Sequence, residues 1–266
     1  NNESFLNFKN LYLEVNEQNA ISSGIIDSID LLNKDYSSVL KWTLKGSMLY
    51  KADLAVLSIL ANYEWKRPIY FASIMGMQAN RYLQKHMNCE GLTYKLTPIN
   101  FGGSGGTNVN KMLELMNGSY VLNKRNNEKD SVGFLWGNMK GENVYVDYYT
   151  MRMVQNLRLQ MMKLSDELIA KNRYDDALNV LNLCFEEMPV ENEQVPTDDI
   201  CYYLCSNFYE AGDTIRGNEI GETLVKLQLQ RLRHFASMNK SQLNYVWNEL
   251  GKALFNIEML RESSLL

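Results

Sequence analysis

Apolar residues recur at helical spacing through the second half of this chain. From residue 149 onwards they follow one another every three or four positions, beginning with Met153, Leu157, Met161, Leu164 and Leu168. Such a period places the apolar side chains on one face of a helix. No proline, which interrupts helices, occurs between residues 149 and 188, so we expect residues 148–266 to be all-helical.

The first half shows a mixed pattern in which short strands and helices alternate. Asp53 is expected to cap a helix over residues 53–63, with Leu54, Leu57, Ile59 and Leu60 on its apolar face. Pro68 prevents that helix from continuing. The other elements expected before residue 100 are a hairpin or bent strand at 42–50, a strand at 69–72, a short helix at 79–86 and a strand at 92–99.

Beyond residue 100 the pattern is less regular. The glycine-rich stretch 101–110 indicates a flexible loop, residues 109–116 a short helix, and the polar segment 123–131 a turn. Two short aromatic runs, 134–137 and 144–146, are expected to be strands. The fold class is therefore α+β, with an α/β-type layered domain over residues 1–147 and a helical domain over residues 148–266.

The helical domain contains a degenerate internal repeat. After the turn at 172–176 come Ala177, Leu181, Cys184 and Pro189. Forty residues later the pattern recurs, with Gly212 in the turn and Gly217 and Leu224 at the positions of Ala177 and Cys184. Small residues at such offsets let two antiparallel helices approach closely, and Cys205 is expected to be the facing small residue of the second unit. A third unit begins at WNELGKAL, residues 247–254. The pattern resembles a tetratricopeptide repeat, and a generic antiparallel bundle is the alternative.

The most distinctive motifs are WKRPIYFA, residues 65–72, and EGLTYKLTP, residues 90–98. In this order, ahead of repeat-like helices, they resemble the C-terminal extramembrane region of bacterial protein O-mannosyltransferase-like multi-spanning membrane proteins, a family of unknown function. The resemblance covers roughly residues 42–230. It implies a parent protein that transfers a sugar from a lipid-linked donor, with its catalytic residues in a membrane part absent from this chain. No motif is assigned to residues 1–40.

The first of these motifs forms a corner with two interpretations. An exposed Trp65 stacking on a sugar, with Lys66 and Arg67 gripping an anion, would make a ligand site together with Tyr70, Glu90 and Tyr94. Alternatively, Trp65 packs on the preceding helix and Arg67 pairs with an acid such as Glu90. We favour the structural interpretation.

Composition restricts the chemistry further. The chain has 266 residues, of which 45% are apolar, and a net charge of −4; residues 151–266 carry 12 Lys and Arg against 17 Asp and Glu. Nucleic acid is therefore not an expected partner. His86 near Glu90 is expected to be structural, and the four cysteines to be buried thiols. With two histidines and no CxxC pair, no metal or other cofactor is expected. No apolar run is long enough to cross a bilayer.

These observations leave three functional hypotheses. The first is a non-catalytic accessory domain of a membrane glycosyltransferase-like protein, on the extracytoplasmic (periplasmic) face, which positions acceptor protein or partner subunits. The membrane would then be reached through the missing N-terminal part. The second is a free-standing interaction scaffold, and the third an enzyme with a site near Trp65, Arg67 and Glu90. A peptide-binding helical face would be lined by Tyr202, Tyr203 and Tyr209.

Overall fold

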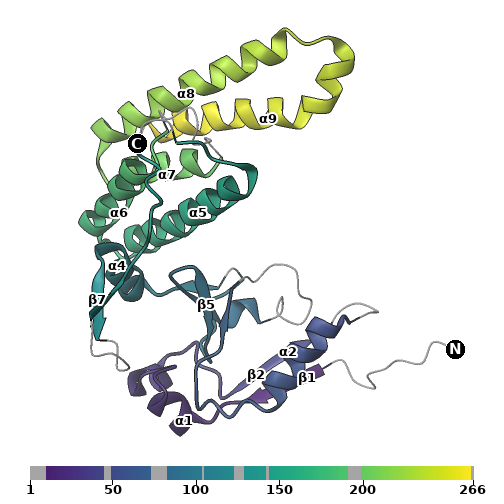
Figure 1. Cartoon of the computed structure of the whole chain (residues 1–266), viewed down its shortest axis with the longest axis vertical. Coiled ribbons are helices and arrows are strands. Elements are labelled where there is room, and N and C mark those ends of the chain that lie inside the picture. Colours follow the sequence, from purple (N-terminus) through teal and green to yellow (C-terminus); the bar gives the residue numbers. More distant parts are fainter. Residues whose placement is uncertain are drawn as a thin grey trace, which may run out of the picture. The chain divides into compact units, whose positions relative to one another are not determined.

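A computed structural model describes residues 10–44, 49–72, 83–103, 105–122, 129–141, 144–190 and 199–264. The chain divides into two compact units, Asn1–Met112 and Leu113–Leu266. The first contains mixed sheets with helices and the second is mainly helical, which confirms the α+β class (Figure 1). The predicted domain division after residue 147 stays a prediction.

The N-terminal unit opens with a two-stranded antiparallel ribbon. Strand β1 (Asn10–Glu14) pairs with β2 (Val39–Thr43), and Leu13 lies opposite Leu40. Helix α1 (Glu17–Ser22) and the 3₁₀ helix η1 (Ser28–Leu32) connect the two strands. Of the hairpin or bent strand expected at 42–50, residues 42–43 belong to β2, which begins at Val39, and residues 45–48 lie outside the described part. Residues before 40, to which no motif was assigned, supply the partner strand.

A four-stranded sheet in the order β3-β5-β4-β6 forms the rest of this unit. Strand β3 (Tyr70–Phe71) and β4 (Met87–Glu90) both pair antiparallel with β5 (Thr93–Leu96). The strands predicted at 69–72 and 92–99 are confirmed as β3 and β5, with Tyr94 and Leu96 buried. Of the helix predicted at 79–86, residues 79–82 lie outside the described part. The 3₁₀ helix η2 (Gln84–His86) covers its last three positions.

The loop predicted over residues 101–110 is interrupted by a short strand and ends where the next helix begins, and Ser104 lies outside the described part. Strand β6 (Gly106–Thr107) pairs parallel with β4. Gly105 has a φ of +79°, and a side chain there would lie 2.6 Å from the carbonyl oxygen of Met87. Glycine is therefore needed for the chain to approach the sheet closely. Helix α4 (Val109–Asn117) follows, as predicted.

Helix α2 (Lys51–Ala61) begins earlier than predicted, and Tyr50 occupies the cap position. Asp53 lies in the first turn, where its buried carboxylate accepts a 2.9 Å hydrogen bond from the Tyr50 amide. The apolar face was only partly right: Leu60 is buried, but Leu54 and Ile59 are exposed. Two large apolar side chains on α2 thus face solvent.

The second unit begins with a hairpin of β7 (Ser119–Leu122) and β8 (Lys129–Val132). The predicted polar turn overlaps this hairpin; residues 123–128 lie outside the described part. The strands predicted at 134–137 and 144–146 were wrong, because residues 134–136 and 144–147 have no regular structure and 137–140 form a turn. Leu135 and Tyr145 are exposed, and the described residues of these runs pair with no strand.

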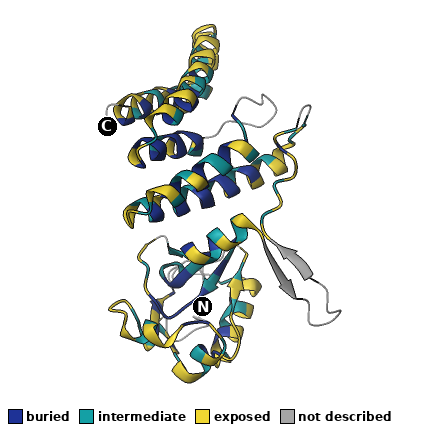
Figure 2. Cartoon of the chain, turned by 90° about the vertical axis from the view of Figure 1, so that its left-hand side faces the viewer, coloured by how far each residue is buried: buried dark blue, intermediate teal, exposed yellow. Residues whose placement is uncertain are grey.

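Five helices make up most of what the structure describes of the second unit after this hairpin. Their bounds are α5 (Tyr148–Ala170), α6 (Tyr174–Glu187), α7 (Ile200–Glu210), α8 (Thr214–Ala236) and α9 (Lys240–Ser263). Asn172 and Gly212 adopt positive φ values of 56° and 93° in the turns after α5 and α7. The apolar sides of these helices face one another (Figure 2). The predicted all-helical region is confirmed.

Small residues bring α7 and α8 close together, as the repeat pattern predicts. The Cys205 thiol lies 3.3 Å from the carbonyl oxygen of Gly217. A side chain at Gly217 would lie 3.0 Å from the ring of Tyr209, and one at Gly221 would lie 3.3 Å from its hydroxyl. The Tyr209 ring can therefore lie against the backbone of α8. All four cysteines are buried thiols, as expected.

Candidate functional site

Trp65 is a structural residue of the corner. Its side chain is 0% exposed, and its indole nitrogen donates a 2.8 Å hydrogen bond to the carbonyl oxygen of Glu14 in β1. The ring of Tyr63 lies 4.6 Å away, centroid to centroid. Trp65 also has a φ of 60°, which strains a bulky residue. The surrounding contacts fix this conformation, and the indole has no face open to a sugar.

Helix α1 secures the backbone of the same corner. The Asn19 amide donates a 2.7 Å hydrogen bond to the carbonyl oxygen of Glu64, and the Ser23 hydroxyl donates a 2.9 Å bond to that of Trp65. Lys66 is exposed and forms an ion pair with Glu64. Arg67 is also exposed. The cations of the motif therefore face solvent, while its tryptophan is buried.

Glu90 is the centre of a polar cluster on the four-stranded sheet. Its Oε1 accepts hydrogen bonds from Lys95 at 2.7 Å and from Asn108 at 2.8 Å, and its Oε2 accepts one from the Tyr70 hydroxyl at 2.8 Å. The side chains of Glu90 and Lys95 are only 9% and 12% exposed. Glu90 therefore pairs with Lys95, and the suggested Arg67–Glu90 pairing was wrong.

The surroundings of Glu90 keep it ionised. Burial acts to raise the pKa of Glu90, but the hydrogen bonds from Lys95, Asn108 and Tyr70 outweigh burial and lower the pKa. Partial burial and the bond to Glu90 raise the pKa of Tyr70 to about 12. Tyr94, also predicted for this site, is buried. This cluster joins β3, β4, β5 and the residue before α4, and it suits a structural brace.

His86 is buried beside the same sheet. Its Nδ1 lies 3.1 Å from the carbonyl oxygen of Ile99. A carbonyl only accepts, so Nδ1 carries the proton. Burial lowers the pKa of His86, which favours the neutral imidazole. The thiol of Cys89 lies 3.5 Å from the carbonyl oxygen of Gly91. These contacts suit packing within the sheet.

The three tyrosines predicted for a peptide-binding face are not on one surface. Tyr202 is buried, and its hydroxyl accepts a 2.6 Å hydrogen bond from Gln228. Tyr203 is exposed, and Tyr209 is buried with its hydroxyl donating a 3.0 Å bond to Asn218. The proposed face was wrong as a set. Tyr209 nonetheless lines a cleft on the second unit.

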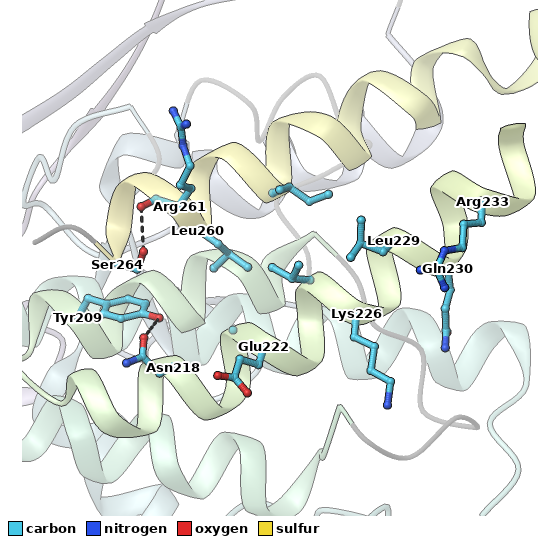
Figure 3. A pocket seen from close by; sticks show the side chains of 13 residues that line it. Tyr209, Asn218, Glu222, Lys226, Leu229, Gln230, Arg233, Leu260, Arg261 and Ser264 are labelled. Carbon is cyan, nitrogen blue, oxygen red and sulfur yellow. Dashed lines mark hydrogen bonds between the residues drawn. The ribbon is translucent and has the colours of Figure 1, made fainter.

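This cleft lies between α8 and α9 and has a volume of about 550 Å³ (Figure 3). Leu260 points from α9 toward α8 in this view, and Tyr209 lies at one end. Its apolar lining includes Val225, Leu229 and Ile257. The glycine at position 221 leaves room above the Tyr209 hydroxyl. We call this cleft the α8–α9 groove.

Charged residues surround the apolar part of the groove. Lys226, Arg233 and Arg261 supply three cations, and Glu222 supplies one anion. Arg261 also forms an ion pair with Glu258 on its own helix. An apolar floor with a mainly cationic rim suits an amphipathic polypeptide segment that carries acidic residues. The lining of the groove thus suits a macromolecular ligand of this kind.

Of the residues that line the groove, only Tyr209 was among the candidates predicted from the sequence. A signal for the others was present, because α8 carries them at intervals of three or four residues, on one stripe of the helix. The stripe was not recognised because its members are chemically mixed. The α8 residues of this stripe are Asn218, Gly221, Glu222, Val225, Lys226, Leu229, Gln230 and Arg233.

The fold is that of a two-unit α+β chain, with mixed sheets and helices in the first unit and a mainly helical second unit that carries the groove. Residues 1–113 match the model of TMEM260-associated domain 2, and this match coincides closely with the first compact unit. TMEM260 is a multi-spanning membrane protein of the O-mannosyltransferase-like family. The match covers less than half of the chain. No curated protein and no solved structure matches it.

Two further findings concern the described ranges alone. None of the helices in them has the length and apolar character needed to cross a bilayer. Nor do these ranges bring three histidine, cysteine, aspartate or glutamate side chains together in an arrangement that could hold a metal ion.

Proposed function

We propose that this chain is a non-catalytic, extracytoplasmic accessory region of a membrane glycosyltransferase-like protein, in which the helical unit positions acceptor protein or partner subunits. The α8–α9 groove is the observation that carries the proposal, because its apolar floor and cationic rim suit a polypeptide segment. The match of residues 1–113 to a TMEM260-associated domain supports the membrane-bound parent. The burial of Trp65 weighs against a sugar-binding corner.

The groove is expected to distinguish acidic from basic polypeptides. Two fluorescent amphipathic helical peptides would share the same leucines and differ only in carrying glutamate or lysine on the polar face. We expect the glutamate peptide to bind the 266-residue chain about tenfold more tightly, because the rim is mainly cationic. Fluorescence anisotropy titrations at low and high salt measure this difference, which salt should reduce.

Charge reversal in the groove provides the matched control. The variant K226E/R233E should lose the preference for the glutamate peptide. The variant R152E/K171E changes the net charge equally, at one position on α5 and at the residue that follows its last turn, and should keep the preference. Leu229→Ala should weaken the binding of both peptides, because Leu229 supplies apolar lining. Equal affinity for the two peptides, or an equal effect of the two charge reversals, would rule the groove out as the binding site.

A further inference from the structure

The outward face of α9 carries large apolar side chains in solvent. Trp247 is 67% exposed, Leu254 54% and Phe255 58%. Gly251 lies between them in the helix and is also exposed. A side chain added at Gly251 would meet no atom within 4 Å. No described element of the chain therefore covers this stripe, which we call the outer α9 face.

In the two preceding repeat units, α5–α6 and α7–α8, another helix covers the positions that correspond to this face. The third repeat unit places Trp247, Leu250, Gly251 and Leu254 at the opening positions of its first helix. The corresponding positions of α5 and α7 carry side chains that are all 0% exposed. In α5 they are Met161, Leu164, Ser165 and Leu168, and in α7, forty residues later, they are Cys201, Leu204, Cys205 and Phe208. This face of a first helix is thus one that packs against another helix.

The sequence of α9 indicates which helix that is. In an antiparallel pair of identical helices crossing at Gly251, each residue before the crossing faces the residue equally far after it. Lys240 then faces Glu262 of the second copy, and Trp247 faces Phe255 of the second copy. Leu254 lies at the side of the outer α9 face. The residues along its centre, spaced three or four apart, are Lys240, Asn244, Trp247, Gly251, Phe255, Glu258 and Glu262, and all are exposed.

We propose that the outer α9 face binds the outer α9 face of a second copy of this chain, as an antiparallel pair about Gly251. Glycine at the crossing lets the two backbones approach closely, and the aromatic residues on either side supply apolar contact. Lys240 and Glu262 form complementary ion pairs at both ends of the contact. This surface is distinct from the α8–α9 groove, so either proposal can fail while the other stands.

The dimer is expected to depend on concentration. One pair of helices buries less than the roughly 1,600 Å² of a standard interface, so association should be weak and reversible. Sedimentation equilibrium of the full chain over about a hundredfold range of concentration should show the mass rise from that of a monomer toward twice that value. A chain that stays monomeric at every concentration would overturn the proposal. This holds even if the outer α9 face binds a helix of another protein.

Charge exchange tests the antiparallel register. K240E and E262K should each weaken self-association about tenfold, because each places like charges opposite one another at both ends. The double variant K240E/E262K should restore it, and an equimolar mixture of the two single variants should form mixed dimers. Both changes place a favourable charge at the ends of α9, so neither should unfold the helix.

Gly251→Leu separates packing from folding. The side chain has open space in the monomer, and circular dichroism should show unchanged helix content, while leucine at the crossing should weaken self-association at least tenfold. A dimer that resists Gly251→Leu and both single charge variants would use another surface and contradict the proposal.

Discussion

Replacing Trp65 by alanine is expected to lower the free energy of unfolding of the N-terminal unit by about 3–5 kcal/mol. The side chain is 0% exposed, and its indole nitrogen bonds the carbonyl oxygen of Glu14. Alanine would leave a cavity and an unsatisfied carbonyl at the junction of the corner with β1. In the wild type, the contacts of the Trp65 side chain offset the strain of its positive φ. Alanine would keep the strain and lose those contacts.

Hydrogen exchange in β1 and urea unfolding followed by far-ultraviolet circular dichroism measure this effect. Leu54→Ala is the control, because Leu54 is 42% exposed and its truncation should change stability by less than about 1 kcal/mol. Trp65→Phe should lose less stability than Trp65→Ala and more than Leu54→Ala, since phenylalanine keeps part of the packing and loses the hydrogen bond. If Trp65→Ala unfolds no more easily than Leu54→Ala, the structural role of Trp65 is refuted.

Removing the carboxylate of Glu90 is the second change with a large expected effect. Glu90→Ala should cost about 3 kcal/mol, because it leaves the Lys95 ammonium largely buried without its partner. The double variant E90L/K95M removes both charges and should recover most of that loss. A double variant that is as unstable as Glu90→Ala would contradict the assigned pairing.

The same cluster gives a pH dependence. Because the pKa of Glu90 is lowered on folding, the ionised carboxylate stabilises the fold above its unfolded pKa of about 4.3. That contribution is lost as the pH falls through the folded pKa. Wild-type stability should therefore fall more steeply below about pH 4 than that of E90L/K95M. Thermal unfolding of both proteins across this pH range measures the difference.

Long elements with a strong period were predictable from sequence. Helix α5 follows from the spacing of its apolar residues. The turn at Asn172 and the contact between Cys205 and Gly217 follow from the resemblance to a tetratricopeptide repeat, although residues 174–176 of the predicted turn already belong to α6. Pro68 correctly indicated the change from helix to strand. In each case the local sequence determines the conformation with little help from distant residues.

Short strands were less predictable, because a strand depends on a partner that the local sequence does not identify. Residues 134–137 have strand-like composition and no partner, whereas Gly106 and Thr107 have weak strand propensity and pair with β4. The β1 strand was missed for the same reason. Pairing and packing outweigh intrinsic preference in segments of this length.

The site was predicted in part. The sequence correctly marked the corner at Trp65 as unusual, and the structural alternative agrees with its burial. The exposed tyrosine face was wrong because Tyr202 turns inward to bond Gln228. Aromatic residues on a helix serve cores and surfaces alike, so their type alone does not give their direction.

The most direct test of the whole account concerns the parent polypeptide in its native host. An antibody raised against this chain would be used on membranes washed with high salt, and the size and location of the detected polypeptide recorded. We expect a polypeptide far heavier than the 30.8 kDa of this chain, retained in the washed membranes. A polypeptide close to 30.8 kDa that appears only in the supernatant would contradict it and would favour a free-standing scaffold.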